Sequence, residues 1–596
     1  MRTDLPLMLL TLIYLCASGV THAQTPSTVP GLDERIVVTG TAAPATAGSV
    51  GRTLAIVTAD DLRQLPVASV ADALRLLPGV WVRHRGPFGS QTDVSVRGAS
   101  FGQTLVLVDG VRLNDAQTGH HNGDLPVALE DIARIELLSG AGSSLHGADA
   151  VGGVINIITK QTADAPSARM AAGQHGLVQA GVAWRPATVP VLAGMSASVD
   201  RSTGFAPARD FLHRQVRADL RLGTTTLAVA LLDKDFGAAG YYGPAPSHER
   251  TNQVLVTARQ NRKLRGAWSL TADAWYRSHG DTFLYDPRAT GAQPNRHRTH
   301  AVGGAIRFGG ALSSTMRLTS GVEATADWLR SSALGAREEG RVSAFAELEA
   351  RAGRLLLYPS VRVDAYSTFG TAVSPSLAVA LPLRPRVKWR ASVGRAFRVP
   401  TFTERYYTDP NHLASPSLEP EQGWTGDTGV DTYLGGSWVG SVTTFVRRER
   451  DVIDWVRPDA TVRWRTENIR DVRSHGFEAS LRGRRGPAAI GLQYAFTRVE
   501  TGALVGLSKY VDDYAPHGLG GDIAVQLPWA LSAGARVEHR RPYARDAWTT
   551  LDVRLARPVK RMTMFVEAAN IGDARYEEIR GVAMPGRWLR AGVSVR

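Results

Sequence analysis

Apolar and polar residues alternate one by one along much of the chain after residue 165. Clear examples lie at residues 215–222, 342–351 and 387–393. A period of two places successive side chains on opposite faces, so each segment predicts a β-strand with one apolar and one polar face. Strands of about nine to eleven residues are long enough to cross a bilayer when tilted.

The number of such segments predicts a closed barrel. At roughly twenty residues for each strand and its connection, residues 161–596 accommodate about 22 antiparallel strands, the size class of transmembrane barrels with a plugged lumen. A soluble β-sandwich would show the same alternation, usually in shorter strands. The lack of a helical pattern in this region, behind a secretory leader, favours the membrane barrel.

Between residues 54 and 160 the pattern instead mixes helical and strand periods. Ser69 and Asp72 are the two ends of a capping box, and Pro78-Gly79 ends the helix that follows. Short apolar strands are predicted at residues 105–108, 132–138 and 154–159. This region therefore predicts a small α/β domain of about a hundred residues.

The first 53 residues carry signals for export and for a tether. Residues 1–23 combine Arg2, an apolar stretch and a small-residue ending, which predicts a cleaved secretory signal peptide. Residues 24–53 are rich in Thr, Ala, Pro, Gly and Ser, which favours a flexible tether. Residues 36–39 are its one β-prone segment, with a first strand of the next domain as the alternative interpretation.

Composition and charge narrow the function classes. The single cysteine, Cys16, excludes a disulfide framework and a cysteine-based zinc site. The net charge of +14 suggests an acidic partner, such as nucleic acid, lipid phosphate or an anionic ligand. Export argues against nucleic acid, and no compact basic run stands out.

One motif suggests catalysis. Gly98-Ala99-Ser100-Phe101-Gly102 matches the G-x-S-x-G pattern of nucleophilic serines. A predicted strand follows it at once, so no helix N-terminus is available to build an oxyanion hole. Since no clustered nucleophile and base can be assembled elsewhere, the sequence predicts that the chain is not an enzyme.

Two groups of polar residues are candidate metal ligands. His120, His121 and Asp124 lie close together in a predicted loop. Either they contact a metal or a ligand, or they form hydrogen bonds within the loop. Four aspartates in predicted loops are either calcium ligands or solvated carboxylates. They are Asp233, Asp235, Asp512 and Asp513.

Six short motifs, in order, resemble those of the TonB-dependent outer-membrane receptors. They are residues 36–40 (IVVTG), 70–80 (VADALRLLPGV), 94–98 (VSVRG), 106–111 (VLVDGV), 132–140 (IARIELLSG) and 152–159 (GGVINIIT). Further similarities to the family lie in the predicted barrel, at residues 395–400, 416–421, 467–469, 476–478, 570–573 and 585–587. Residues 117–122 and 236–242 are most similar to the cobalamin-receptor-like subgroup.

The resemblance implies that residues 54–160 form an α/β plug that occludes the barrel of residues 161–596. It also implies a TonB box within the periplasmic tether of residues 24–53. The residues of that box are Ile36, Val37, Val38, Thr39 and Gly40. The implied partners are TonB with its inner-membrane energising complex, outer-membrane lipid and lipopolysaccharide, and a scarce metal chelate, but no nucleic acid.

The resemblance favours a cobalamin-like chelate as the cargo. A ferric siderophore is the alternative, followed by haem or other chelated metals. A passive porin or adhesive barrel and an outer-membrane enzyme are the other classes of function. No tightly bound cofactor is expected, apart from the loop calcium. Family barrels generally end in an aromatic residue, whereas this sequence ends in Val595-Arg596.

Ligand contacts are expected on the apical loop after Asp109-Gly110. The candidates are Arg112, Asn114, His120, His121 and Asp124. Tyr241 and Tyr242 are second candidates, because an aromatic pair can stack on a flat macrocycle, with an interfacial aromatic belt as the alternative.

Charge is divided unevenly between the two predicted domains. Residues 24–160 hold ten basic and thirteen acidic side chains, which leaves a net charge of +17 for residues 161–596. We hypothesise that attraction between an acidic plug and a basic barrel helps to seat the plug.

Overall fold

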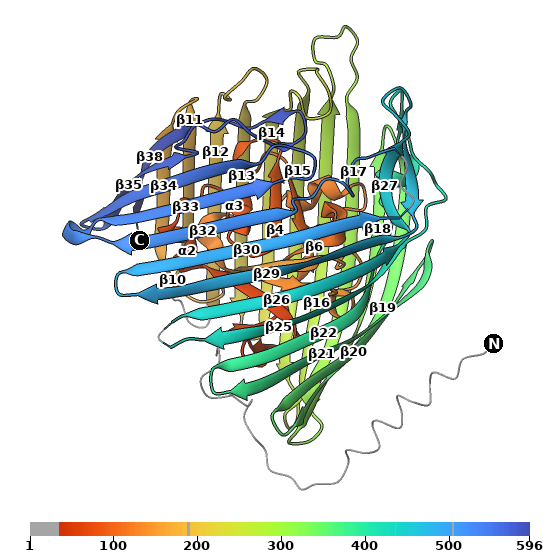
Figure 1. Ribbon diagram of the computed structural model, residues 1–596, viewed down its shortest axis with the longest axis vertical. Helices are drawn as coiled ribbons and strands as arrows, with labels where there is room; N and C mark the ends of the chain where they lie inside the picture. Colours follow the sequence, from red (N-terminus) through yellow and green to blue (C-terminus); the bar gives the residue numbers. More distant parts are fainter. Residues whose placement is uncertain (1–34, 187–190, 436, 503–505, 596) are drawn as a thin grey trace.

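The computed structural model describes residues 35–186, 191–435, 437–502 and 506–595. The predicted signal peptide of residues 1–23 lies outside these ranges. Twenty-two antiparallel strands form one closed barrel, in which the first strand pairs with the last (Figure 1). The prediction of about 22 barrel strands is therefore confirmed.

In chain order the barrel strands are β10 (Asp164–Gly173), β11 (Leu177–Arg185), β12 (Val191–Ser202), β13 (Phe211–Leu222), β14 (Thr225–Gly237), β15 (His248–Lys263), β16 (Ser269–Leu284), β17 (Asn295–Ala311), β18 (Met316–Ser331), β19 (Gly335–Ala352), β20 (Leu355–Tyr366), β21 (Gly370–Arg384), β22 (Val387–Arg398), β25 (Glu421–Tyr433), β26 (Val439–Arg450), β29 (Val472–Arg485), β30 (Ala488–Thr501), β32 (His517–Gln526), β33 (Ser532–Arg541), β34 (Trp548–Val559), β35 (Met562–Ala569) and β38 (Trp588–Val595).

The strands differ in length around the barrel. They run from 8 residues in β35 and β38 to 18 residues in β19. The longest exceed the nine to eleven residues or so that a bilayer crossing requires, because they continue beyond it. Figure 1 shows the hairpin of β16 and β17 rising above its neighbours.

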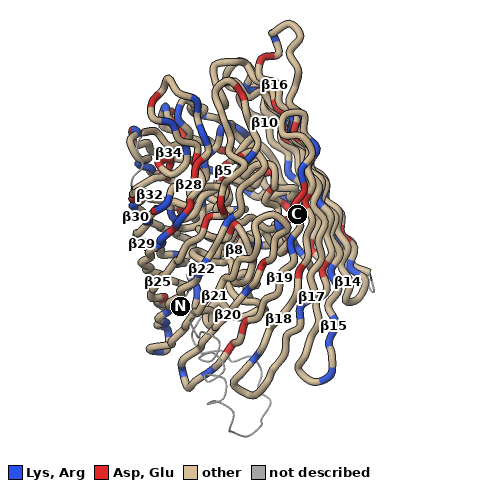
Figure 2. Tube along the Cα trace, turned by 90° about the vertical axis from the view of Figure 1, so that its right-hand side faces the viewer, with Lys and Arg blue, Asp and Glu red and all other residues tan. Residues whose placement is uncertain are grey.

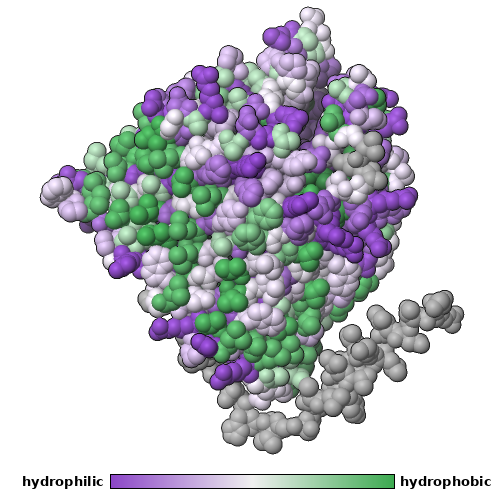
Figure 3. All heavy atoms as spheres, viewed as in Figure 1, coloured by the Kyte–Doolittle hydropathy of each residue, from purple (hydrophilic) through white to green (hydrophobic). Residues whose placement is uncertain are grey.

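The alternation in the sequence corresponds to the two faces of the barrel wall. On β19, Val342 is 63% exposed on the outer face, whereas its neighbours Arg341 and Ser343 point inward and are buried. Figure 3 shows hydrophobic side chains covering the outward face of the strands, with hydrophilic ones toward the margins. The outer wall is therefore suited to lipid, and the inner wall is polar.

The two ends of the barrel differ. Short connections, such as residues 223–224 and 353–354, join strands at one end, which we call the turn end. Long connections, such as residues 399–420 and 570–587, lie at the other, which we call the loop end.

The plug lies inside the barrel and is built on a five-stranded sheet. Its strand order is β3 (Thr53–Thr58), β8 (Ile132–Ser139), β9 (Gly153–Thr159), β6 (Thr104–Val108) and β7 (Val111–Arg112). Only the β6–β9 pair is parallel. Apolar side chains of the sheet, including Val106, Ile135 and Ile155, form the centre of the largest buried hydrophobic cluster.

Short helices and one hairpin complete the plug. They are α2 (Ala59–Gln64), α3 (Val70–Leu74), α4 (Ser143–His146), η1 (Pro87–Gly89), η2 (Phe101–Gln103), η3 (Gly119–Gly123), η4 (Leu129–Asp131), β4 (Val80–His84) and β5 (Thr92–Val96). Ser69 caps α3, and its capping box with Asp72 is present as predicted. A strand, β6, follows Gly102 closely, so the serine motif has no helix behind it.

Loop segments form further structure at the loop end. A five-stranded sheet joins β23 (Thr408–Asp409), β24 (His412–Leu413), β28 (Trp464–Ile469), β27 (Val452–Arg457) and β31 (Leu507–Ser508). At the same end lie β36 (Glu577–Ile579), β37 (Val582–Ala583) and α5 (Phe402–Tyr406), whereas η5 (Pro528–Ala530) lies in the short turn between β32 and β33. Within the described ranges, none of the helices has the length and apolar character to span a membrane.

Candidate ligand pocket and N-terminal segment

Residues 36–40, which we call the N-terminal segment, are docked at the turn end of the molecule. Ile36 and Val37 form β1 (Ile36–Val37), which pairs antiparallel with β2 (Ala45–Thr46). The chain after this hairpin is also docked, because the hydroxyl of Tyr358 donates a 3.0 Å hydrogen bond to the carbonyl of Ser49.

One carboxylate holds the N-terminal segment. Oε2 of Glu136 accepts hydrogen bonds from the backbone N–H groups of Val38 and Thr39, both at 3.0 Å, and from the Thr39 hydroxyl at 2.6 Å. Oε1 of the same group accepts a 2.8 Å bond from Arg134. Because Glu136 is fully buried on the central sheet, the segment is tied directly to the plug core.

Backbone contacts strengthen this docking. Nε2 of His146 donates to the carbonyl of Thr39 at 3.0 Å, and Arg52 donates to the carbonyl of Gly40 at 2.9 Å. Burial, together with the nearby guanidinium groups of Arg362, Arg52 and Arg112, lowers the pKa of His146 to about 4. The imidazole is therefore neutral at pH 7 and its Nε2–H is the donor.

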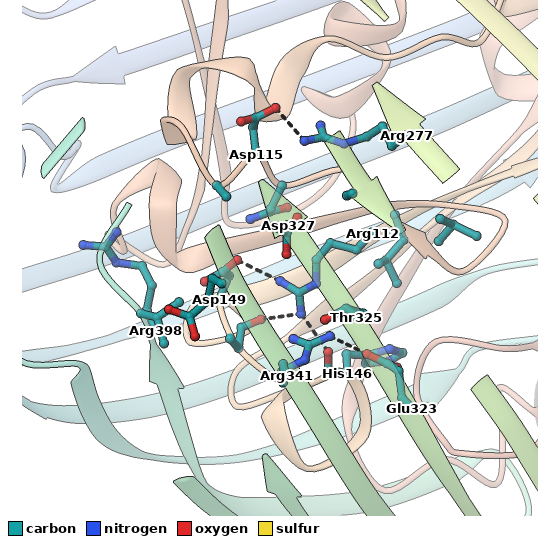
Figure 4. A pocket seen from close by; sticks show the side chains of 18 of the residues that line it. Arg112, Asp115, His146, Asp149, Arg277, Glu323, Thr325, Asp327, Arg341 and Arg398 are labelled. Carbon is teal, nitrogen blue, oxygen red and sulfur yellow. Dashed lines mark hydrogen bonds and ion pairs between the residues drawn. The ribbon is translucent and has the colours of Figure 1, made fainter. Parts of the chain in front are cut away.

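A cavity of about 160 Å³ lies between the plug and strands β16 to β19 (Figure 4). Arg112, a predicted ligand residue, lines it and forms a 2.8 Å ion pair with Asp149. On the barrel side the wall carries Glu323 and Arg341, which pair with each other. The cavity is smaller than the roughly 300–1,000 Å³ of typical small-molecule pockets, so in this state it has room only for a small solute or ion.

The other predicted apical residues have distinct surroundings. Asn114 lies on the cavity wall. Its side-chain amide accepts a 2.9 Å hydrogen bond from the N–H of Val106 and donates a 3.1 Å bond to the carbonyl of Thr104, so it fixes the loop to β6. His120 stacks on Phe101 with ring centroids 4.4 Å apart.

His120 is also paired with a carboxylate. Its Nδ1 lies 2.8 Å from Oδ1 of Asp93, and its Nε2 lies 3.4 Å from the hydroxyl of Tyr510 on the loop that follows β30. Burial lowers the pKa of His120, and Asp93 opposes that effect only in part. The apex of the plug thus touches a loop of the barrel mouth through His120.

His121 and Asp124 instead face the barrel wall. Nε2 of His121 lies 3.4 Å from Oδ2 of Asp281, and Asp124 receives a 2.6 Å ion pair from Lys234. Burial lowers the pKa of His121, but the Asp281 carboxylate outweighs it and the net result is a pKa raised to about 9. Burial raises the pKa of Asp124, and Lys234 with His279 reverses this, so the group is ionised.

Tyr241 and Tyr242 lie in the loop between β14 and β15. Tyr241 is buried in an aromatic cluster with Phe236, and its ring lies 4.8 Å below the guanidinium of Arg209. Tyr242 is 43% exposed and accepts a hydrogen bond from Gln91 of the plug. Of the pair, Tyr242 is the one available for contact with a ligand.

The four predicted calcium ligands are not gathered in one cluster among the described residues. Asp233 faces outward on β14, where it pairs with Arg250 at 3.0 Å, and Asp235 pairs with His248 at 3.0 Å. Asp512 and Asp513 lie in the loop after β30, where Asp513 pairs with Arg83 and Arg545. A loop calcium site stays a prediction.

Ion pairs of both polarities cross from plug to barrel. Plug Asp115 and Asp131 pair with barrel Arg277 and Arg185 at 2.5 and 3.3 Å, while plug Arg97 pairs with barrel Glu478 at 2.8 Å. Figure 2 shows basic and acidic positions interspersed through both domains. The seating of the plug therefore depends on specific local pairs more than on the overall difference in charge.

Several residues of these sites were not predicted. Glu136 was missed because a single charged residue in an apolar strand has no partner visible in the sequence. Glu249, His279 and Asp281 were missed although the last two occupy alternate, inward-facing positions of β16. That period-two pattern of polar residues was the available signal.

A wide barrel closed by an internal plug, with a docked segment at the turn end, defines a gated membrane transporter. The family model "TonB dependent receptor-like, beta-barrel" matches residues 198–577, and the model "TonB-dependent Receptor Plug Domain" matches residues 46–154. The chain therefore belongs to the TonB-dependent receptor family. Its members are receptors and transporters of the outer membrane, so the prediction that the chain is not an enzyme is confirmed.

Individual relatives are more distant. The chain is 24% identical to the vitamin B12 transporter BtuB of Vibrio vulnificus (strain YJ016) over 503 residues, which cover 77% of this chain and 76% of the relative. The structure of the siderophore receptor PirA from Acinetobacter baumannii is similar at TM-score 0.74 and 16% identity, covering 92% of this chain and 98% of PirA. The copper transporter OprC is similar at TM-score 0.78 and 15% identity, covering 91% and 98%.

Proposed function

We propose that this receptor imports a cobalamin-like metal chelate, using work delivered by TonB to the N-terminal segment. The relative that supports the cargo is a vitamin B12 transporter matching three quarters of both chains. Residues 117–122 and 236–242 resemble the cobalamin-receptor-like subgroup. They include His120 and Tyr242 and lie at the loop end.

The observation that carries the transport mechanism is the plug inside the barrel. The cavity between plug and β16 to β19 holds about 160 Å³, so a chelate cannot pass along that side unless the plug moves. The plug is held by buried hydrogen bonds and ion pairs, so moving it requires external work.

The N-terminal segment is the proposed point where that work enters. Ile36 and Val38 are 53% and 37% exposed, so one edge of the segment is open to a partner. A short β-prone segment can add to the sheet edge of another protein through backbone hydrogen bonds. Tension on it would act first on Glu136, which joins the segment to the central sheet.

The proposed ligand surface lies at the apex rather than in the cavity. His120 and Tyr242 are its main candidates, because each reaches the mouth of the barrel and each is an aromatic ring that can contact a flat macrocycle. Arg112 and Asn114 lie below this surface and would meet cargo only after the plug has moved.

The cargo is tested by direct binding to purified protein. Cyanocobalamin is titrated against the full chain beside a panel of ferric siderophores, and the Tyr242→Ala variant is measured with Tyr242→Phe as its control. We expect binding of cyanocobalamin only, and binding about fivefold weaker for the alanine variant, because loss of a stacked aromatic costs about 1 kcal/mol. Binding of a ferric siderophore without cyanocobalamin would contradict the proposal and favour the siderophore class.

A further inference from the structure

Five ionisable side chains meet where the plug touches β15 and β16, near the loop end. The plug contributes two of them and the barrel three, and each is at most 7% exposed. They are His121, Asp124, Glu249, His279 and Asp281. We call this group the interface cluster.

The cluster is compact enough to enclose one ion. Nε2 of His279 lies 2.9 Å from Oδ2 of Asp124, and the rings of His121 and His279 are 4.5 Å apart. Two sets of three candidate ligand atoms lie within 4.8 Å of one another, and His121 belongs to both sets. Ligand atoms of a zinc-sized ion bound at about 2.0–2.2 Å lie roughly 3.4 Å from one another, so the widest pairs would close by about an ångström when the ion binds.

The interface cluster contains polar atoms that lack partners. Four of its side chains each have a buried nitrogen or oxygen without a hydrogen bond. These atoms are Nε2 of His121, Nδ1 of His279, Oε2 of Glu249 and Oδ1 of Asp281. A buried unsatisfied polar group costs about 1–3 kcal/mol, so four in one place indicate a missing component.

Charge identifies that component as a cation. Among the described residues the carboxylates of Asp115 and Asp124 have permanent cationic partners, Arg277 at 2.5 Å and Lys234 at 2.6 Å. Within the same described ranges, neither Glu249 nor Asp281 has an ion pair with a lysine or arginine. Asp281 accepts a hydrogen bond from Gln117 and lies 3.4 Å from Nε2 of His121. Two carboxylates without a lysine or arginine partner, beside two imidazoles, match the charge of a divalent ion.

The ligand types restrict the choice of ion. Calcium and magnesium prefer cages of oxygen, whereas imidazole nitrogen favours zinc and its neighbours. Neither cysteine nor methionine is present among the five, which argues against copper in its reduced state. We propose that the interface cluster binds one divalent transition-metal ion of the zinc type, joining the plug to β15 and β16.

An ion can reach the interface cluster from the neighbouring cavity. Asp115 and Asn122 line the cavity of Figure 4, and Asp115 lies 3.6 Å from Nδ1 of His279. A solvent-sized space therefore adjoins the ligands. The site is separate from the apical surface of His120 and Tyr242, so it does not depend on which chelate the receptor carries.

The experiment uses the full chain in detergent, treated with a chelator and titrated with Zn²⁺ alone. We expect one zinc per chain by calorimetry and by elemental analysis after desalting, and cobalt absorption bands of imidazole-carboxylate coordination when Co²⁺ replaces it. His279→Ala and His121→Ala are expected to weaken zinc binding by about a hundredfold or more, since loss even of an outer partner costs 10–100-fold.

Matched variants make the result specific. His539→Ala removes an imidazole that faces outward on β33 and is expected to bind zinc like the unmodified chain. Asp281→Asn and His279→Gln keep the side-chain volume, so they retain the fold and still lose affinity. The proposal is overturned if the unmodified chain binds zinc no better than His121→Ala with His279→Ala combined, or if Ca²⁺ binds as tightly as Zn²⁺.

Discussion

The plug carries two polar contacts of opposite character, one toward each end of the barrel. At the turn end, the buried side-chain atoms of Glu136, Thr39 and His146 all have partners. At the loop end, the interface cluster leaves buried oxygens of Glu249 and Asp281 without a hydrogen bond. The contact around Glu136 is therefore fully hydrogen-bonded, whereas the interface cluster has polar atoms that are free to bind an ion.

That difference suits the two jobs of an energised importer. In the proposed mechanism, the contact around Glu136 keeps the N-terminal segment docked until TonB pulls it. At the proposed metal site, an ion would stabilise the closed state by mass action, because it binds that state. The predictions below separate the two kinds of contact by removing one partner from each.

The largest expected effect is on a buried ion pair between plug and barrel. Arg97 makes two hydrogen bonds to Glu478, at 3.1 and 2.8 Å. Arg97→Met leaves Glu478 buried and uncompensated, which destabilises the plug by about 3–5 kcal/mol. By contrast, Glu249 has no ion pair with a lysine or arginine among the described residues, so Glu249→Gln is expected to leave the metal-free plug as stable as before.

Hydrogen exchange of the plug amides, followed by mass spectrometry, measures both variants. Adding Glu478→Gln to Arg97→Met serves as the control and is expected to recover part of the loss. If Glu249→Gln destabilised the metal-free plug as much as Arg97→Met, the two contacts would not differ as described.

A smaller effect is expected when the anchor of the N-terminal segment is removed. Glu136→Ala deletes the acceptor of three hydrogen bonds to the segment, and a bond to a charged group contributes about 1.5–3 kcal/mol. The undocked population is expected to rise about tenfold or more, with Glu136→Gln in between because it keeps an oxygen acceptor.

A spin label at Ile36→Cys reports docking by electron paramagnetic resonance. The label is placed in a Cys16→Ser background, which makes it unique because Cys16 is the only native cysteine. An unchanged label spectrum in Glu136→Ala would show that Glu136 does not hold the segment.

The smallest effect is a dependence of docking on pH. The pKa of His146 is about 4 when buried beside Arg362, Arg52 and Arg112, below the ordinary value near 6.5 that undocking restores. Protons therefore favour the undocked state, and docking weakens as the pH falls from 6.5 toward 4. The undocked fraction is expected to rise about fourfold between pH 8 and pH 6.

The same spin label measures this effect. His146→Gln keeps a donor to the carbonyl of Thr39 and does not titrate, so its profile is expected to be flat. A pH response of equal size in both proteins would assign the effect to another group.

The fold could be predicted from the sequence because its signals are local. The period-two pattern of residues 342–351 defines the faces of β19, and the Ser69 capping box places α3. Two of the five residues of the interface cluster could also be predicted, since His121 and Asp124 stand three residues apart. Their partners were not, because His279 and Asp281 join them only through the register of plug against barrel wall.

The central claim is that TonB engages the N-terminal segment by adding it as a strand. The most direct measurement is binding of the purified periplasmic part of TonB to the full chain, with Val37→Pro compared with Val37→Ala. Proline removes a backbone donor that strand addition needs, whereas alanine keeps it. We predict that Val37→Ala binds TonB and supports uptake, and that Val37→Pro does neither while still binding its cargo. Undiminished TonB binding by Val37→Pro would contradict the account.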